Sequence, residues 1–267
     1  MKLSRMLAIP LRQYYLYKGS TARVVPLLGW VTIDMVLWGF MTRFLSGLGQ
    51  TQYRFVPALL GAVLFWDFMT RVMFGVTTAF FEDVWSRNFL NVFSSPITVA
   101  EYLCGLVTTS IGTSLVALAA MVVVATAAFG LSFAPYGLML APFVMVLFLF
   151  GIALGIAAIA IVLRLGPAAE WFVWPIPALM APFCAVYYPV TTLPVAFRWI
   201  ALLLPPSYVF EGMRAVVSGQ DFHGAELVTA FALALVYILL AYWIFSRVFR
   251  HALRTGLLAR YSAETLN

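Results

Sequence analysis

Long apolar runs separated by short polar connections make up most of this chain of 267 residues. A helix needs about 20 predominantly apolar residues to cross the hydrocarbon core of a bilayer. The composition, with 64% hydrophobic and 10% charged residues, departs far from the soluble norm of about half apolar and a quarter charged. We therefore predict an all-α membrane protein, a single transmembrane domain over residues 1–267, with six spans at residues 24–45, 55–79, 103–130, 136–163, 171–189 and 227–249.

A seventh apolar segment, residues 193–217, contains prolines and charged residues that a straight lipid-facing helix would not tolerate. We predict a re-entrant hairpin over residues 190–220. In it, two short helices enter the membrane from one side and turn back at Pro205 and Pro206. Irregular backbone at membrane depth must be surrounded by protein or by a watery cavity.

Basic residues gather on one side of the predicted spans. An excess of Lys and Arg marks the cytoplasmic side, so we predict that both chain ends and the polar connection at 81–97 are cytoplasmic. The formal net charge of +6 then reflects topology and attraction to anionic lipid, and it does not indicate a nucleic-acid partner. The residues on the basic side are Lys2, Arg5, Arg12, Lys18, Arg23, Arg87, Arg164, Arg247, Arg250, Arg254 and Arg260, against Arg43, Arg54, Arg198 and Arg214 on the other.

The first 23 residues have the pattern of a helix that lies along the membrane surface. Leu3, Leu7, Leu11 and Tyr14 share one helical face, whereas the basic residues lie elsewhere on the helix. We predict an amphipathic interfacial helix over residues 1–23, held by its basic residues and by tyrosines. The alternative is a basic topology signal with no further role.

The polar connection between the second and third spans carries an aromatic residue at every fourth position. On one helix, Phe81, Trp85, Phe89 and Phe93 would form a single stripe, because residues four apart are neighbours on a helix. Such a stripe could sit in a groove of another protein while the polar face stays in water. A connecting helix lying on the bilayer is the alternative. The polar face would carry Glu82, Asp83, Arg87, Asn88 and Asn91.

The order of these parts resembles the type-2 export permeases of ATP-binding-cassette (ABC) transporters, nearly from end to end. The segment EDVWSRNFLNVFSSPITVAEY is similar to the acidic and arginine-containing coupling segment of that family, with its Ser-Pro exit into the third span. The segment LLPPSYVFEGMRAV is similar to the proline, aromatic and Gly-x-Arg signature before the last span. The short outer loops depart from those members that carry a large external domain.

The resemblance implies a dimer of permeases above two nucleotide-binding ATPase subunits. The sequence independently supports a separate ATPase. A P-loop needs a lysine behind a glycine-rich turn, and the only lysines, Lys2 and Lys18, lack such a turn. ATP and Mg²⁺ would therefore bind to the partner subunit, and we expect no cofactor in this chain. The resemblance places a coupling helix over residues 81–97 in a cleft of the ATPase, with contacts from Phe81, Glu82, Asp83, Trp85, Arg87 and Phe89.

Three charged residues fall at similar depths in the first two spans. Asp67 and Arg71 are four residues apart on one predicted helix and can pair there. Counting about 1.5 Å per residue from the cytoplasmic ends places Asp34 within reach of the same arginine. We predict a buried ion pair that fixes the helix register, and direct contact with a transported molecule is the alternative.

The resemblance also implies that the region around the hairpin closes the conduit to the outside. Candidate gate or conduit residues are Tyr187, Tyr188, Tyr208, Glu211 and Arg214. Helix capping and interfacial anchoring of aromatic side chains would explain the same residues. In the fourth span, Gly151 and Gly155 form a small-xxx-small pair that lets another helix approach closely.

The pattern of polar residues gives no sign of catalysis or of a metal site. His223 and His251 fall on opposite predicted sides of the membrane, and neither a hydrolase triad nor metal-ligand spacing is present. The prediction is the permease subunit of an ABC exporter for an amphipathic or lipid-linked molecule, with polysaccharide or glycolipid as its most specific form. A stand-alone secondary transporter or channel is the alternative, and a membrane enzyme or scaffold is the third class.

Overall fold

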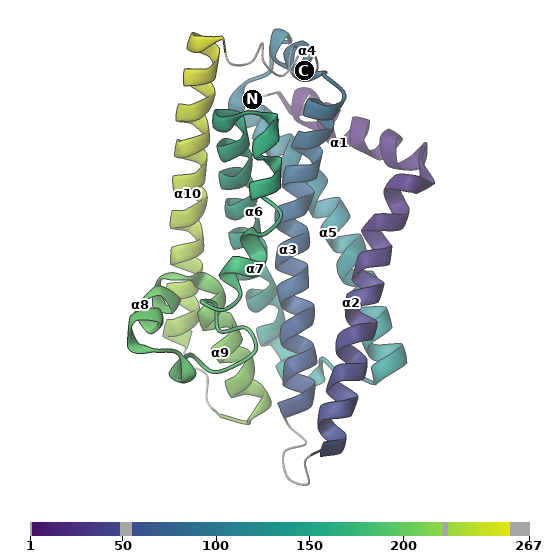
Figure 1. Cartoon of the computed structure of the whole chain (residues 1–267), viewed down its shortest axis with the longest axis vertical. Helices are drawn as coiled ribbons and strands as arrows, with labels where there is room; N and C mark the ends of the chain where they lie inside the picture. Colours follow the sequence, from purple (N-terminus) through teal and green to yellow (C-terminus); the bar gives the residue numbers. More distant parts are fainter. Residues whose placement is uncertain (1, 49–54, 221–223, 257–267) are drawn as a thin grey trace.

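The computed structural model describes residues 2–48, 55–220 and 224–256, and this part of the chain is helical and contains no strand. Five helices are long and apolar enough to cross a membrane, and they run along the length of the molecule (Figure 1). This arrangement confirms the predicted all-α membrane fold. The five are α2 (Thr21–Leu48), α3 (Phe55–Trp85), α5 (Val99–Phe129), α6 (Leu140–Leu165) and α10 (Gly224–Thr255).

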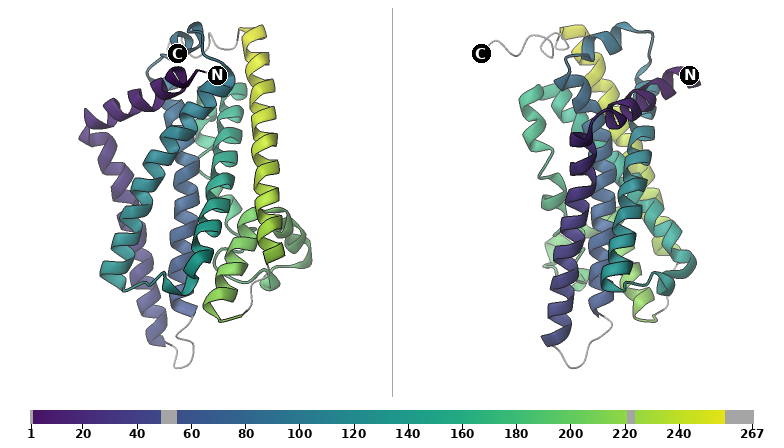
Figure 2. Two further views of the ribbon diagram at one scale, coloured as in Figure 1. Left: turned by 180° about the vertical axis from the view of Figure 1, so that it is seen from behind. Right: turned by 90° about the vertical axis from the view of Figure 1, so that its right-hand side faces the viewer.

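Short helices lie at both ends of this bundle. One end, called here the α4 end, carries α1 (Leu3–Lys18), α4 (Phe89–Ser94) and the carboxyl end of α10 (Figures 1 and 2). The other, the α8 end, carries α8 (Val195–Leu203) and α9 (Pro205–Val217). The polar connection and the hairpin therefore lie at opposite ends, as their order in the sequence predicts.

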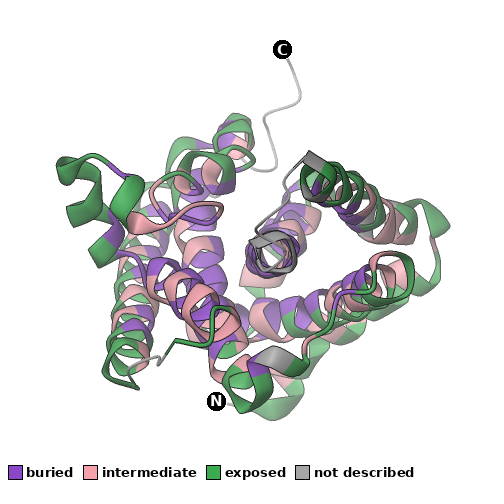
Figure 3. Cartoon of the chain, turned by 90° about the horizontal axis from the view of Figure 1, so that it is seen from below, coloured by how far each residue is buried: buried purple, intermediate pink, exposed green. Residues whose placement is uncertain are grey.

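Helix α3 lies at the centre of the bundle, packed against α2, α5 and α6, and most of its side chains are buried (Figure 3). The predicted close approach at the glycine pair of α6 is confirmed. A Cβ added at Gly151 would lie 2.7 Å from the carbonyl oxygen of Met69, and one at Gly155 would lie 2.8 Å from the Cβ of Val76. Only hydrogen atoms at these positions let the two backbones meet.

Helix α5 begins and ends with strong local signals. Thr98 accepts a hydrogen bond from the Glu101 backbone N–H, and the Glu101 carboxylate accepts one from the Thr98 backbone N–H. This reciprocal capping box satisfies two of the N–H groups that a helix start leaves unpaired. Gly130, with φ of 68°, ends the helix in the left-handed conformation that glycine adopts without strain.

The fifth predicted span, residues 171–189, is not a continuous helix, and that prediction is wrong. The chain forms the short 3-10 helix η2 (Pro167–Phe172), then α7 (Ile176–Met180), and otherwise turns. Pro175, Pro177, Pro182 and Pro189 interrupt the segment, and proline lacks the N–H that a helix interior needs. Residues 166–190, called here the broken segment, still run from the α4 end to the α8 end (Figure 1).

The hairpin prediction is confirmed in its helical geometry. Helices α8 and α9 meet at Leu204 with a bend of 99°. Pro205 and Pro206 occupy the first turn of α9, where a missing N–H leaves no hydrogen bond unmade.

The predicted aromatic stripe on one cytoplasmic helix is also wrong. Helix α3 continues to Trp85, and α4 starts only at Phe89. Arg87 between them has a φ of 53°, a left-handed conformation that breaks the helix and changes its direction. Phe81 and Phe89, at 0% and 1% exposure, pack inside the bundle.

Candidate functional site

The α3–α4 turn, residues 82–91, contributes several exposed residues to the predicted coupling element. The side chain of Trp85 is 51% exposed, and Ser86, Arg87 and Asn91 are also exposed. Phe93 instead packs on Tyr102 and Phe249, with ring centroids 4.9 and 4.6 Å away. The turn therefore presents polar groups and one indole to the outside, while the other aromatic rings hold it to the bundle.

Asp83 is fully buried and is held by two groups of this chain. An Nη1 of Arg12 on α1 lies 2.5 Å from Asp83 Oδ1, and the Tyr102 hydroxyl donates to Asp83 Oδ2 at 2.8 Å. A buried carboxylate needs such partners, because leaving it unpaired costs several kcal/mol. Asp83 thus connects α1, α3 and α5.

Glu82 pairs with Arg23 in the first turn of α2, at 2.5 Å. Tyr17, near the end of α1, lies beside this pair. Burial, and next the nearby Glu82 carboxylate, raise the pKa of the Tyr17 hydroxyl, and Arg23 opposes that effect. The phenol therefore stays neutral across the physiological range, and Glu82 connects the start of α2 to the end of α3.

The start of α1 is tied to α5. The backbone N–H of Lys2 donates to Glu101 Oε1 at 2.7 Å, and Arg5 lies 3.9 Å from Glu101 Oε2. Arg5 also donates to the carbonyl oxygen of Pro96. Arg5 and Arg12 of α1 thus pair within the chain, whereas Leu3, Leu7, Leu11 and Tyr14 are exposed along one face. The interfacial position of α1 stays a prediction.

Trp85 connects the turn to the broken segment. Its indole N–H donates to Glu170 Oε2, on η2, at 2.9 Å. The α3–α4 turn is therefore linked by side chains to three other elements: α1 through Asp83, α2 through Glu82 and the broken segment through Trp85.

Two of the three intramembrane charges form an ion pair. An Nη2 of Arg71 on α3 lies 3.7 Å from Asp34 Oδ2 on α2. The predicted pair within α3 is not formed in the described part of the chain, and the guanidinium of Arg71 contacts Asp34 on the neighbouring helix. Asp67 Oδ2 is buried and has no hydrogen-bond partner in the described part of the chain. The trio therefore consists of one inter-helix pair and one unpaired carboxylate.

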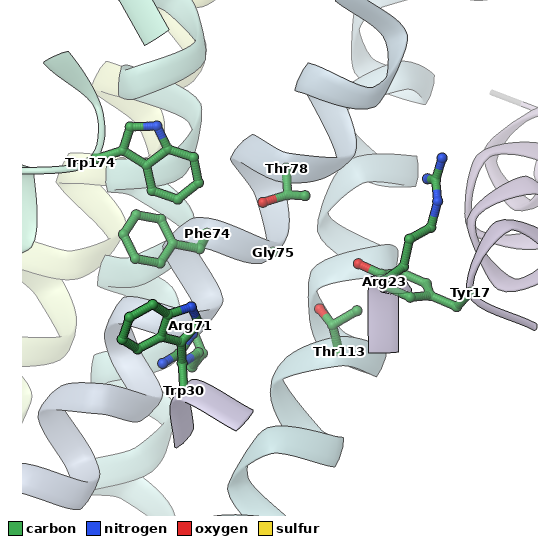
Figure 4. A pocket seen from close by; sticks show the side chains of 9 residues that line it. All are labelled: Tyr17, Arg23, Trp30, Arg71, Phe74, Gly75, Thr78, Thr113 and Trp174. Atoms are coloured by element: carbon green, nitrogen blue, oxygen red, sulfur yellow. The ribbon is translucent and has the colours of Figure 1, made fainter. Parts of the chain in front are cut away.

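Two cavities adjoin along one side of α3. The inner cavity, of about 250 Å³, extends from Tyr17 and Arg23 to Arg71 (Figure 4). The outer cavity, of about 510 Å³, lies between α3 and the broken segment and reaches Tyr187 and Tyr188. Both are lined by Phe74 and Trp174, whose ring centroids are 5.0 Å apart. A series of spaces thus follows α3 from the α4 end toward the α8 end.

The outer cavity is bordered by two tyrosines that the sequence singled out. Tyr187 stacks on Trp38 of α2, with ring centroids 5.3 Å apart and an interplanar angle of 16°. The Tyr188 hydroxyl donates to the Pro182 carbonyl oxygen at 2.8 Å. The stack joins the broken segment to α2 on the side of α3 where the cavities lie.

The other candidate gate residues form hydrogen bonds with main-chain atoms and do not line the two cavities. Arg214 donates to the carbonyl oxygens of Val186 at 3.2 Å and Ala185 at 3.0 Å, and Glu211 accepts from the Val190 backbone N–H at 2.6 Å. Ala185 has a φ of 49°, which is strained for a residue with a side chain. The Glu211 carboxylate and the Arg214 guanidinium also pair with each other at 3.0 Å. Together they hold the backbone next to Tyr187 and Tyr188, called here the Tyr187–Tyr188 corner. Tyr208 donates to Leu202, within the hairpin.

Several residues of the site were not predicted from the sequence. Trp38, Phe74 and Trp174 are three aromatics in a chain that is 16% aromatic, so nothing in the sequence marked them. Arg12 pairs with Asp83 and Arg23 pairs with Glu82, but from the sequence both arginines are interpreted as topology signals. The basic residues among residues 1–23 and the acidic residues Glu82 and Asp83 have opposite charges. This complementarity was the signal that could have predicted the two ion pairs.

Comparison with known proteins agrees with this arrangement. A search of curated proteins returned no significant match. A family model described as ABC-2 type transporter matches residues 17–217, which extend from the end of α1 through α9 and contain both cavities. Because the match covers most of the chain, the protein belongs to the ABC-2 type transporter family, as a membrane-spanning transport subunit.

Proposed function

We propose that this chain is the permease subunit of an ATP-driven exporter, and that the two cavities along α3 form part of the translocation path in each subunit. Family membership supports the transport role. The observation that carries the proposal is that the two cavities adjoin, since both are lined by Phe74 and Trp174, and that they lie between elements linked to the α3–α4 turn. A path that opens and closes needs walls that can move together.

Energy would come from a separate ATPase subunit that binds ATP and Mg²⁺. The α3–α4 turn is the proposed contact, with Trp85 and Arg87 as the exposed groups that meet the partner. Phe81, Asp83 and Phe89 would support the turn from inside, and Glu82 would pass its movement to α2 through Arg23. A shift of this turn would then displace α1, α2 and the broken segment, which carry one wall of the cavities.

The assembly would be a dimer of this permease, most simply a homodimer, in the bacterial inner membrane. The positive-inside rule favours cytoplasmic chain ends and a cytoplasmic α4 end. The α8 end would then face outward, and the Tyr187–Tyr188 corner would be the outer gate. Lipid would cover the exposed apolar side chains of α2 and α10, such as Phe40, Leu235 and Leu239.

The cargo would be an amphipathic or lipid-linked molecule, of which a polysaccharide or glycolipid is the most specific form. Aromatic walls with a few polar groups are typical of sites for such ligands. The rings of Phe74, Trp174, Tyr187 and Tyr188 supply flat apolar surfaces, and Thr70 and Asp67 supply polar atoms.

Reconstitution tests this function. The chain, purified with its ATPase partner and placed in vesicles, should stimulate ATP turnover and accumulate labelled lipid-linked glycan in an ATP-dependent way. The same vesicles with a partner unable to hydrolyse ATP are the control. Gradient-driven flux by the chain alone, without the ATPase, would instead establish a secondary transporter or channel.

A further inference from the structure

The outer cavity is lined by a carboxylate that forms no ion pair within the described part of the chain. Asp67 lines the cavity, and its Oδ2 has no hydrogen-bond partner. The one nearby cation, Arg71, is committed to Asp34 on α2 at 3.7 Å. Thr70, one turn further along α3, also lines the cavity with a hydroxyl oxygen that lacks a partner. Two residues of the cavity wall therefore carry a buried oxygen atom without a hydrogen-bond partner.

An unpaired carboxylate at this depth is unfavourable without a counter-charge. Intramembrane charges are costly and are normally paired with one another or with a ligand. When both aspartates are ionised, the trio of Asp34, Asp67 and Arg71 has two negative charges and one positive charge, and one further positive charge would balance it. A neutral hydroxyl group would donate a hydrogen bond to Asp67 but would leave the net charge in place.

The other walls of the cavity are suited to a cation. Aromatic side chains surround the carboxylate, and the negative face of an aromatic ring attracts a cation within about 6 Å of its centroid. Such rings also provide apolar contact for the hydrocarbon that carries the charge. The aromatic residues that line the cavity are Trp66, Phe74, Trp174, Tyr187 and Tyr188.

We propose that the outer cavity binds a positively charged amine carried by the amphipathic cargo, with Asp67 as its counter-ion. This inference rests on the proposed export function and narrows its cargo. The aromatic rings would hold the amine and its attached carbon chain, and Thr70 would accept a hydrogen bond from an N–H. An amino sugar on a glycolipid and an alkyl ammonium group share the positive charge, whereas a quaternary ammonium has no N–H for Thr70.

Three probes with the same dodecyl chain test the proposal: dodecyltrimethylammonium, dodecyl maltoside and a dodecyl glucosaminide, whose amine is protonated. Each is titrated below its micellar concentration into the full chain in nanodiscs, with the heat measured for empty nanodiscs subtracted. The wild-type chain should bind the ammonium probe at least about tenfold more tightly than the maltoside, a difference of about 1.4 kcal/mol. The Asp67→Asn variant should bind the two equally, through loss of affinity for the ammonium probe.

Two further variants keep the test independent of local damage. Asp34→Asn, which changes no residue lining the outer cavity, frees Arg71 to turn toward Asp67, so it should also abolish the preference for the ammonium probe. Thr70→Val keeps the shape of the wall and the charge, so it should retain the preference. Equal preference in wild type and Asp67→Asn would overturn the proposal, and so would a loss of maltoside binding in Asp67→Asn as large as the loss of ammonium binding.

The glucosaminide separates the two sources of the amine. Affinity equal to that of the ammonium probe assigns an amino sugar, and weaker affinity that still exceeds that of the maltoside assigns a simpler cationic amphiphile. Either result supports the charge selectivity. Because no ATPase is present in this assay, failure of amine binding would leave ATP-driven export standing, whereas failure of export in vesicles would leave the binding preference intact.

Discussion

The two ends of the bundle are held together in different ways. At the α4 end, charged side chains pair with side chains from other helices, as in Asp83 with Arg12 and Glu82 with Arg23. At the α8 end, charged side chains mostly hold main-chain atoms, as when Arg214 donates to the carbonyl oxygens of Ala185 and Val186. Pairs between helices transmit movement from one helix to another. The bonds of Arg214 instead fix the main chain of one turn of the broken segment against α9.

This contrast suits the proposed roles of the two ends. A region that receives movement from a motor subunit needs rigid connections among several helices. A region that forms a gate needs a defined shape that can shift as a unit. Substitutions at the two ends should therefore differ in their effect on stability.

Loss of Arg12 should have the largest effect, because among the described residues it leaves the fully buried Asp83 carboxylate with the Tyr102 hydroxyl as its one side-chain partner. Breaking a fully buried pair costs about 3–5 kcal/mol. The Arg12 side chain is 31% exposed, so we expect Arg12→Ala to cost about 2–3 kcal/mol. Thermal unfolding in detergent, followed by tryptophan fluorescence, measures the change.

Arg5→Ala is the matched control for that variant. Arg5 lies 3.9 Å from Glu101, whose carboxylate also accepts two backbone N–H groups, so its loss should cost less than about 1 kcal/mol. An equal loss of stability in the two variants would show that the α4 end is held by general charge and not by the pair at Asp83.

Replacement of Gly151 tests the close packing of α6 against α3, the helices that connect the two ends of the bundle. An alanine Cβ would lie 2.7 Å from the Met69 carbonyl oxygen and 2.9 Å from the Cβ of Val72, so α3 and α6 must separate. Overpacking of this kind costs about 1–3 kcal/mol. Gly112→Ala on α5 is the control, since nothing lies within 4 Å of its added Cβ. Unfolding midpoints that do not differ between the two variants would contradict the close packing.

Arg214→Ala should destabilise the protein less, by about 1–2 kcal/mol, because it removes hydrogen bonds from a partly buried group to carbonyl oxygens. Its main effect should be a looser Tyr187–Tyr188 corner and a passive leak of small solutes from vesicles without ATP. Arg198→Ala, which loses bonds to Leu193 and Thr191 further along the loop, should leak less. If vesicles that contain Arg214→Ala show no leak of small solutes, Arg214 does not position the Tyr187–Tyr188 corner.

Arg87→Glu should have the smallest effect on stability, within about 0.5 kcal/mol, because Arg87 is exposed. It reverses the charge on the proposed partner surface, so we expect ATP turnover to continue while export falls at least tenfold. Arg164→Glu is the control, since Arg164 is an exposed arginine at the end of α6 and lies outside the turn. Normal export with Arg87→Glu would refute the coupling role.

Much of the fold follows from local sequence signals. The long apolar runs predicted α2, α3, α5, α6 and α10, and the prolines at 205 and 206 predicted a bend. The similar depths of Asp34 and Arg71 predicted their contact. These predictions succeed because span length, helix breaking and depth depend on residues that are close in the chain.

The failures share one physical cause, which is that a periodic pattern assumes a continuous backbone. The aromatic stripe required one helix through residues 81–93, and the left-handed Arg87 ended that helix. Apolar character alone suggested a helix at 171–189, but four prolines removed the N–H groups that a helix needs. The resulting broken segment forms a wall of the outer cavity.

The sequence by itself determined that this protein is an all-α membrane protein and where its five long helices run, because hydrophobic length is a property of the chain alone. Only the tertiary structure decided which charges find partners. Arg71 could pair with either of two aspartates, and the approach of α2 to α3 gives it to Asp34 and leaves Asp67 facing a cavity. Pairing depends on the distance between helices, which no single segment specifies.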